Sequence, residues 1–496
     1  MTESRREMAG QSVASGATKV ASLVDGRRVP VADWFDDVDP STGRVLARVA
    51  RSGADVVDQA VSAARRAFEV GPWPAMAPKE RGRRLRTLGD LLLRDGDELA
   101  VLESQDTGKP LSQARADVDV AARYFEFYGS CVEALHGDTI PAVPGLLVYT
   151  AHEPLGVTAH IEPWNYPLQI GARTLAPSLA VGNCCVLKPA EEASLSLSRL
   201  AELAMEADIP AGAVNVVTGL GPEAGAALAA HPGIDHLSFT GSVEVGALVA
   251  AAAAANVTPV SLELGGKSPN IVFADADLER AVPIIAKSLL QNAGQTCSAG
   301  SRLLAHESVH APLVDALAEA FRRVRIGPGV DDPDLGPLIS AEQLERLERS
   351  MQEGIGAGEL RCGAKRVSDP GLASGFFYEP TLLDGVDPGS VLAQQELFGP
   401  VLAVFTFTDD EEAVAMANGT DYGLIAAVWT GDVARAHSVA GALRCGQVYV
   451  NTYGAGGGVE LPFGGTKKSG YGREKGFEAL LGFCQTKTVA VHVGSR

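Results

Sequence analysis

Between residues 157 and 263, short apolar runs alternate with longer runs of helical spacing. Apolar runs of four or five residues predict strands, and the runs between them predict helices. Alternation at this spacing is typical of a parallel, doubly wound sheet, as in nucleotide-binding folds. The sequence therefore predicts an α/β fold. The expected strands are residues 157–161, 184–187, 213–217, 236–239 and 260–263, and the expected helices are residues 168–180, 194–207, 222–230 and 245–255.

The preceding segments follow other patterns. Residues 54–70, 79–104 and 114–131 carry apolar side chains three and four apart, which predicts helices. Residues 145–150 and 153–157 predict a pair of strands joined by a short connection.

A second alternating set begins at Asn270 and ends near Phe463. Residues 485–493 then alternate polar and apolar side chains, as an exposed strand does. Because an unpaired strand edge invites association, we expect this strand to pair with another subunit.

Length and charge exclude several classes of protein. A chain of 496 residues exceeds what one hydrophobic core usually supports, so two or more domains are expected. A net charge of −19 argues against nucleic acid and anionic membrane surfaces as partners. No apolar run is long enough for a membrane span, and residues 1–18 lack the apolar core of a secretory signal and predict a disordered tail.

The seven cysteines are scattered and none forms a CxxC pair. This pattern predicts neither a disulfide framework nor a metal site, and reduced thiols suit the cytoplasm. Cys297 lies among small and polar residues after an apolar run, between Gly294 and Gly300. From this segment alone, a reactive nucleophile and a buried structural cysteine are both open interpretations.

Three strand ends carry groups suited to a dinucleotide. Gly219, Gly221 and Gly225 follow one expected strand and open a helix, which allows a phosphate to approach the backbone, although a simple turn explains them as well. Gly241 and Ser242 follow another strand, and their backbone could donate to a pyrophosphate. At a third strand end, Lys188 and Glu191 suit ribose hydroxyls, with a solvated surface pair as the alternative.

Two further side chains suit catalysis. Glu263 lies inside an apolar strand, where a carboxylate with a raised pKa fits a general base; the alternative is pairing with Lys267 or a backbone amide. Asn165, in a loop before a helix, suits donation to a developing oxyanion, with a turn-forming asparagine as the alternative.

From about Val20 to Val493 the sequence resembles the aldehyde dehydrogenase superfamily. Seven ordered motifs carry this resemblance, and together they are highly specific. They are residues 163–167 (PWNYP), 188–191 (KPAE), 239–246 (FTGSVEVG), 262–269 (LELGGKSP), 294–297 (GQTC), 396–400 (ELFGP) and 462–465 (PFGG), the last continuing into 467–474 (KKSGYGRE).

The resemblance implies a Rossmann-like NAD-binding domain, an α/β catalytic domain and a small β arm that joins subunits into a homodimer or homotetramer. The implied organisation is a tail at residues 1–18, an NAD-binding domain at 19–134 and 155–264, a catalytic domain at 265–465, and oligomerisation strands at 135–154 and 479–496.

The resemblance also assigns roles. Cys297 is the implied nucleophile, forming a thiohemiacetal and then a thioester, and Asn165 with the Cys297 backbone amide would hold the oxyanion. Glu263 would activate the water that hydrolyses the thioester, which favours hydrolysis over acyl transfer to coenzyme A. The implied cofactor-binding residues are Trp164, Lys188, Glu191, Gly221, Gly241, Ser242, Glu396 and Phe398. Because the carboxylate of Glu191 would repel a 2′-phosphate, NAD is the expected cofactor, with NADP as a weaker one.

The identity of the aldehyde is less constrained. Small residues in the loop 451–460 suggest a roomy pocket mouth for a bulky or aromatic aldehyde, or serve only as backbone turns. Arg173 matches a carboxylate-binding arginine of succinate-semialdehyde members, but Gln291 stands where those members have a second arginine. Tyr453 and Glu460 suit a betaine-aldehyde cage, which Arg173 would oppose.

Glu474 matches a position linked to proton exit in relatives, but Thr174 replaces its lysine partner, so we assign it no role. Two rival functions remain at this point: a non-catalytic scaffold, which the presence of Cys297 and Glu263 opposes, and a cysteine hydrolase, which the ribose and phosphate motifs oppose.

Overall fold

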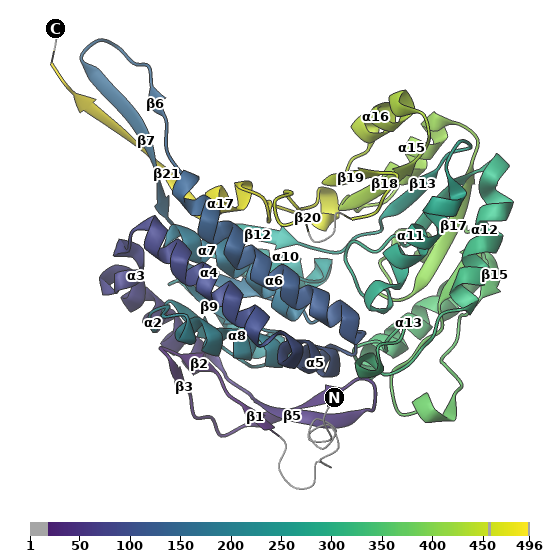
Figure 1. Cartoon of the computed structure of the whole chain (residues 1–496), viewed down its shortest axis with the longest axis horizontal. Helices are drawn as coiled ribbons and strands as arrows, with labels where there is room; N and C mark the ends of the chain where they lie inside the picture. The colour runs from purple at the N-terminus through teal and green to yellow at the C-terminus, as the bar shows by residue number, and fades with distance from the viewer. Residues whose placement is uncertain (1–17, 455–457, 495–496) are drawn as a thin grey trace.

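The computed structural model describes residues 18–454 and 458–494. Its larger sheet has eight strands in the order β20-β12-β11-β8-β9-β10-β2-β3 and forms the left-hand body of Figure 1. The five central strands are parallel, whereas β2, β3 and β20 run antiparallel to their neighbours. The bounds are β2 Leu23–Val24, β3 Arg27–Arg28, β8 Val157–Ile161, β9 Cys184–Lys188, β10 Val214–Val216, β11 His236–Thr240, β12 Val260–Glu263 and β20 Gly470–Tyr471.

All five strands expected between residues 157 and 263 are present. Three of the expected helices are α7 Pro167–Val181, α8 Leu195–Glu206 and α10 Val243–Ala254. The fourth differs, because residues 222–230 form the π-helical turn η2 Gly221–Gly225 followed by the short helix α9 Ala226–Ala229.

An N-terminal group of helices packs on this sheet and shares its hydrophobic core. The helix expected over residues 79–104 is broken at Asp95 into α4 and α5, since Asp95 ends one helix and precedes the next. The bounds are α2 Ala54–Val70, α3 Pro72–Ala75, α4 Pro78–Arg94, α5 Gly96–Thr107 and α6 Leu111–Cys131.

The second sheet has seven strands in the order β15-β16-β17-β14-β13-β18-β19 and encloses a separate core on the right of Figure 1. Every strand except β15 is parallel to its neighbours. Its strands are β13 Pro269–Val272, β14 Arg302–His306, β15 Glu359–Cys362, β16 Thr381–Asp384, β17 Val401–Phe407, β18 Ile425–Trp429 and β19 Gln447–Val450, and its helices are α11 Leu278–Leu290, α12 Glu307–Arg322, α13 Ala341–Gly354, α14 Val391–Gln394, α15 Asp410–Asn418 and α16 Val433–Ala442.

A small N-terminal sheet lies beneath the first body in the order β1-β5-β4. Its strands are β1 Thr18–Val20, β4 Trp34–Asp39 and β5 Arg44–Ala50. The prediction of a disordered tail over residues 1–18 is therefore wrong at Thr18, because Thr18 pairs with Ala47 of β5. Residues 1–17 lie outside the described residues.

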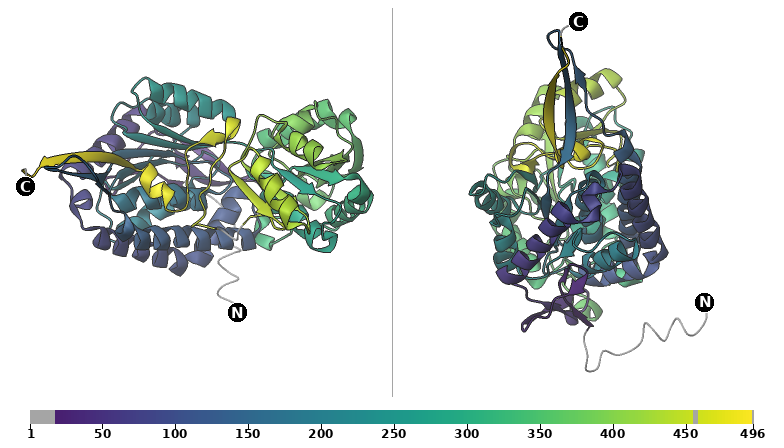
Figure 2. Two further views of the ribbon diagram at one scale, coloured as in Figure 1. Left: turned by 90° about the horizontal axis from the view of Figure 1, so that it is seen from above. Right: turned by 90° about the vertical axis from the view of Figure 1, so that its left-hand side faces the viewer.

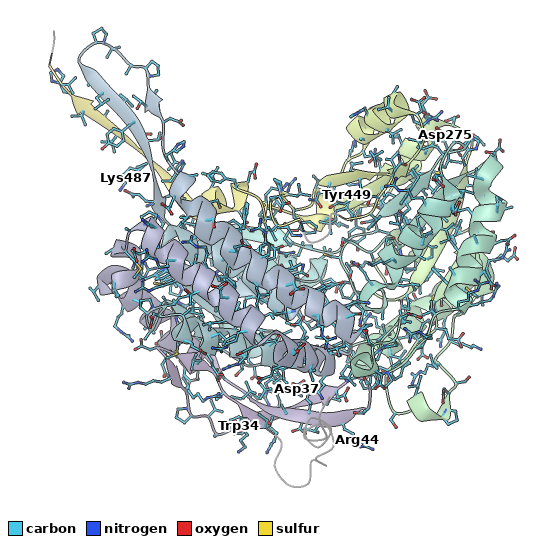
Figure 3. All side chains as sticks on the ribbon, viewed as in Figure 1. Trp34, Asp37, Arg44, Asp275, Tyr449 and Lys487 are labelled. Atoms are coloured by element: carbon cyan, nitrogen blue, oxygen red, sulfur yellow. The ribbon has the colours of Figure 1, made fainter. Side chains whose placement is uncertain are left out.

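An arm of three strands projects from the body (Figures 1 and 2). It consists of β6 Thr139–Ile140, β7 Leu146–Pro154 and β21 Cys484–His492, in the order β21-β7-β6. Lys487 of β21 forms an ion pair with Glu153 of β7 near the base of the arm (2.6 Å, Figure 3).

The arm corrects two expectations. The segments 145–150 and 153–157 do not pair, because β7 is one continuous strand that enters the arm while β8 enters the large sheet. The C-terminal strand pairs along its whole length with β7 of its own chain, and its other edge is open, so its pairing with another subunit stays a prediction. The segment 479–496 begins not with a strand but with the end of helix α17 Glu478–Gly482, whose Ala479 and Leu480 belong to the first core.

Among residues 18–454 and 458–494, no helix combines the length and apolarity needed to cross a membrane. All seven cysteines are free thiols.

Candidate active site

A cavity of about 150 Å³ lies where the strand order of the large sheet reverses. From β8 the chain builds outward through β9 and β10, then returns to the other side of β8 with β11 and β12. The loops that follow parallel strands on either side of such a reversal diverge and leave a crevice at their carboxyl ends. The cavity takes Pro163, Trp164, Asn165, Thr240, Gly241, Ser242, Glu263 and Gly265 from this sheet, and Cys297, Gln343, Arg346, Glu396 and Phe398 from the other half.

Cys297 lies in the loop between α11 and β14 and is half-buried at the cavity. The loop is tightly constrained, because a Cβ at Gly266 would meet the carbonyl oxygen of Cys297 at 2.3 Å. Burial raises the pKa of the Cys297 thiol to about 12, and the positive charge of Arg173 opposes this shift.

Glu263 ends β12 with its side chain buried and facing the cavity. Neither of its carboxyl oxygens has a hydrogen-bond partner among the described residues, so pairing with Lys267 or a backbone amide does not account for it. Burial, followed by the charge of Glu474, raises the pKa of Glu263 well above its usual value. A buried carboxyl group left without a partner is costly and marks a candidate functional group.

Gly464 makes room for this carboxyl group. Its φ of 154° favours glycine, and a Cβ there would approach Oε1 of Glu263 to 2.7 Å. The PFGG motif is therefore explained in part by contact with Glu263, which the sequence did not reveal.

Asn165 follows β8 and is buried. Its Nδ2 donates to the carbonyl oxygen of Gln295 (2.9 Å), two residues before Cys297. The Asn165 carbonyl accepts from Nδ2 of Asn292 (2.9 Å). The amide is therefore bound directly to the cysteine loop, and its second N–H remains for a ligand.

Five residues predicted to bind a cofactor line the same cavity: Trp164, Gly241, Ser242, Glu396 and Phe398. The rings of Trp164 and Phe398 meet edge to face with centroids 5.2 Å apart. Ser242 caps the twelve-residue helix α10 by accepting from the Val245 backbone N–H (3.2 Å). Opposite, Oε1 of Glu396 accepts from the Gly266 N–H (3.0 Å), and burial raises the pKa of Glu396 to about 7.

Three more predicted residues form a neighbouring cluster outside the cavity lining. Nζ of Lys188 lies 3.3 Å from Oε2 of Glu191, and Oε1 of Glu191 accepts from the Gly221 N–H (3.2 Å). The Lys188 side chain is only 2% exposed, so the pair is not a solvated surface contact. The structure thus brings together residues from the ends of β9 and β10.

Arg173 does not line the cavity. Its Nε lies 2.5 Å from Oε2 of Glu474, and its Nη2 donates to Thr240 (3.2 Å). Both charged side chains are less than a tenth exposed. A guanidinium held in this way is not free to bind a substrate carboxylate. Arg173 is thus the cationic partner of Glu474, a role that Thr174 cannot fill.

Tyr453 also differs from the expectation. Its hydroxyl donates to the carbonyl of Ser298 (2.7 Å), so it supports the loop that carries Cys297. Its ring packs, like Tyr449 and Cys297, against a small core of Leu424, Ile425 and Phe463 (Figure 3 labels Tyr449). Residues 455–457 of the loop expected at the pocket mouth lie outside the described residues.

Gln343 and Arg346 line the cavity but were not predicted. Gln343 donates to the carbonyls of Leu397 (3.1 Å) and Phe398 (2.8 Å) and so holds the loop that carries Glu396. Both lie on α13, an amphipathic helix whose sequence has no motif that distinguishes them from surface residues.

Comparison with known proteins identifies the family of this chain. The profile of the aldehyde dehydrogenase family matches residues 30–489. The chain is 42% identical over 473 residues to aldehyde dehydrogenase family 2 member B4, mitochondrial, of Arabidopsis thaliana, covering 94% of this chain and 87% of the relative. It is 41% identical over 455 residues to betaine aldehyde dehydrogenase of Bacillus subtilis (strain 168), covering 91% and 93%.

Solved structures share the fold over nearly the whole chain. A Burkholderia cenocepacia protein assigned as an aldehyde dehydrogenase matches with a TM-score of 0.94 and 53% identity, covering 96% of this chain and 100% of that one. The NAD-dependent aldehyde dehydrogenase of Sinorhizobium meliloti matches with a TM-score of 0.94 and 40% identity, covering 97% and 96%. This chain therefore belongs to the aldehyde dehydrogenase family of oxidoreductases.

Proposed function

We propose that this protein oxidises an aldehyde to a carboxylic acid with NAD as the cofactor, using Cys297 as nucleophile. The observation that carries the proposal is a single cavity lined by Cys297, Asn165 and Glu263 together with Trp164 and Glu396. A scaffold without activity has no need of an unpartnered, buried carboxyl group facing a thiol.

In the first step the Cys297 sulfur attacks the aldehyde carbon, a C–S bond forms and the carbonyl oxygen becomes an oxyanion. The free N–H of Asn165 and the backbone N–H of Cys297 would donate to that oxygen. Because burial keeps the resting thiol protonated at neutral pH, its proton must pass to water as the bond forms; the buried charge of Arg173 favours the thiolate.

NAD, when bound, supplies the acceptor for the hydride that leaves the thiohemiacetal carbon. What remains on Cys297 is a thioester. Water then attacks its carbonyl carbon, Glu263 takes one proton from that water, and the C–S bond breaks to release the carboxylic acid and the Cys297 thiolate. Burial raises the pKa of Glu263, so its carboxylate is a stronger base than an exposed one.

The residues fit the cofactor. Ser242 and the first turn of α10 present backbone donors to a pyrophosphate, whereas the Gly241 N–H already donates to the carbonyl oxygen of Glu263 (3.0 Å). The carboxylate of Glu191 suits a ribose 2′-hydroxyl and would repel the 2′-phosphate of NADP, while Lys188 offsets part of that repulsion. NAD should therefore be preferred, with NADP as a weaker cofactor. Solved relatives include an aldehyde dehydrogenase of Bacillus cereus in complex with NAD+.

For the substrate we propose a bulky or aromatic aldehyde. Cys297 packs against the same small hydrophobic core as Tyr449 and Tyr453, which includes Phe463, and this supports an apolar acyl group. Succinate semialdehyde is less favoured, because Arg173 is already paired with Glu474. Betaine aldehyde is the second candidate, since the same aromatic rings suit a quaternary ammonium group and one relative is a betaine aldehyde dehydrogenase.

We further propose that residues 19–134 and 155–264 form the NAD-binding domain and that residues 265–465 form the catalytic domain. The two separate hydrophobic cores support this division. The open edge of β21 and the exposed apolar side chains of the arm, which include Leu146, Leu147 and Val491, support assembly into a homodimer or homotetramer. Seven free thiols support the cytoplasm as the compartment.

The test is NADH formation, measured by absorbance, across a panel of benzaldehydes, long aliphatic aldehydes, succinate semialdehyde and betaine aldehyde, with NAD and NADP in parallel. Preference for aromatic or bulky members with NAD supports the proposal. Preference for the semialdehyde contradicts the inferred role of Arg173. If no aldehyde gives NADH although NAD still binds, the proposed function is overturned.

A further inference from the structure

A buried charged cluster lies behind the loop that carries Asn165. Lys109, in the turn between α5 and α6, extends its Nζ to Oε1 of Glu103 (2.9 Å) and to Oδ2 of Asp117 (2.5 Å). The side chains of Lys109 and Glu103 are fully buried. Charges are buried at high cost unless they are paired, so this cluster is a rigid feature rather than a solvated contact.

The cluster anchors the Asn165 loop at two points. Nζ of Lys109 lies 4.4 Å from the ring centroid of Tyr166, within the range of a cation–π contact. Oε2 of Glu103 accepts from the backbone N–H of Leu168 in the first turn of α7 (3.3 Å). The residues just after Asn165 are therefore held against the α5–α6 hairpin.

From there the contacts cross to the nucleophile. The hydroxyls of Tyr166 and Thr296 share a hydrogen bond of 2.7 Å, and Thr296 is the residue before Cys297. Asn165 contributes its bond to Gln295, and Oε1 of Gln113 on α6 accepts from the backbone N–H of Asn292 (2.9 Å). The loop that carries the oxyanion donor and the loop that carries the thiol are thus joined by side chains seated on one hairpin.

We propose that Tyr166 is a positioning residue that, seated on the Lys109 cluster, sets the location of Cys297 relative to Asn165. A nucleophile and an oxyanion donor must be held within about 0.5 Å of their working geometry. Neither Tyr166 nor Lys109 touches the cavity, so their contribution to rate would come through Thr296 and Asn165. The catalytic consequence rests on the proposed function, whereas the placement of the thiol does not.

The test uses Tyr166→Phe, which keeps the ring on Lys109 and removes only the hydroxyl, and Thr296→Val, which removes the other half of the same bond. The variant that carries both substitutions completes a double-mutant cycle. Tyr378→Phe, a buried tyrosine in the second core, is the matched control. Lys109→Met is avoided as the main variant because it leaves two carboxylates buried without a cation.

Two readouts are measured: kcat and KM for NADH formation, and the rate constant for alkylation of Cys297 by iodoacetamide, followed by mass spectrometry. We expect Tyr166→Phe to lower kcat about tenfold and to change the alkylation rate several-fold, with the KM for NAD and the melting temperature little changed. The double variant should be no worse than the poorer single variant, because both remove one bond.

Unchanged kcat and alkylation in Tyr166→Phe would overturn the inference. So would fully additive losses, or losses that track the melting temperature, which indicate general destabilisation. A wild-type protein that forms no NADH from any aldehyde refutes the proposed function instead, and the alkylation rates then still decide whether Tyr166 places the thiol.

Discussion

Cys297 and Glu263 share one cavity, and burial disfavours the charged form of both side chains. The positive charge of Arg173 lowers the pKa of both groups, whereas the negative charge of Glu474 raises the pKa of Glu263. The chemistry we propose depends on these two groups exchanging protons with a bound aldehyde and with water.

Cys297→Ala should lower aldehyde oxidation by at least about a thousandfold, because no other group in the cavity can form the covalent intermediate. NAD binding, measured by calorimetry, should be unchanged. Cys362→Ala is the control, since that cysteine is also partly buried but lies in β15. Substantial turnover in Cys297→Ala would refute the mechanism.

Glu263→Gln should slow thioester hydrolysis more than hydride transfer, lowering the steady-state rate about a hundredfold. Stopped-flow absorbance should then show a rapid burst of roughly one NADH per active site followed by a slow phase. Glu319→Gln on the surface of α12 is the control. A variant with normal turnover and no burst would contradict the role given to Glu263.

Arg173→Gln leaves Glu474 buried without its cation, and we expect a loss of about 3 kcal/mol in the free energy of unfolding. Because the guanidinium is occupied, the ratio of kcat/KM for succinate semialdehyde to that for benzaldehyde should stay within about twofold. A selective collapse of semialdehyde oxidation would show that Arg173 binds the substrate carboxylate after all.

At the scale of elements, the N-terminal sheet is joined to helix α5 by two carboxyl groups. Asp37 of β4 and Asp106 of α5 are both buried, and Oδ2 of Asp106 accepts from the Leu195 N–H at the start of α8 (3.0 Å). Burial raises the pKa of Asp37 to about 6, and burial with the charge of Asp37 raises that of Asp106. Two adjacent buried carboxyls cannot both ionise, so the pair retains a proton.

This pair predicts a stability that depends on pH. Between its usual pKa of 3.8 and about 6, folded Asp37 binds a proton that the unfolded chain has released. The free energy of unfolding should therefore fall as pH rises through this window, by about 2–3 kcal/mol in total. Asp37→Asn, which mimics the protonated acid, should flatten this dependence. Equal slopes of the unfolding midpoint against pH in both proteins, from pH 4 to 7, would contradict the prediction.

At the scale of the whole molecule, the arm exposes apolar side chains and an open strand edge. Figure 2 shows from two further directions that the arm projects from the body. Val491→Asp places a charge on that surface. We expect the assembly to dissociate into smaller species, measured by analytical ultracentrifugation, because a buried unpaired charge costs several kcal/mol at an interface. Val433→Asp, on the exposed surface of α16, should leave the mass unchanged. If the mass of the Val491→Asp variant is unaltered, the arm surface around Val491 is not part of the subunit interface.

The sequence by itself determined the elements of the large sheet and the motif residues at their ends. Strand and helix periods between residues 157 and 263 are local properties, and they agree with β8 to β12 apart from the turn before α9. Residues at the ends of parallel strands converge wherever the strand order reverses, so Asn165, Gly241 and Glu263 were predictable as one site.

Only the tertiary structure decided what joins these residues across long separations. No local pattern indicates that Arg173 pairs with Glu474, that Gln343 of a surface-like helix holds the Phe398 loop, or that Tyr166 reaches Thr296. The C-terminal strand is a further example. Its alternation of polar and apolar residues predicts an exposed strand, but it does not predict that β7 of the same chain pairs with one edge of that strand. These contacts depend on packing between segments 55 or more residues apart, which period and composition do not encode.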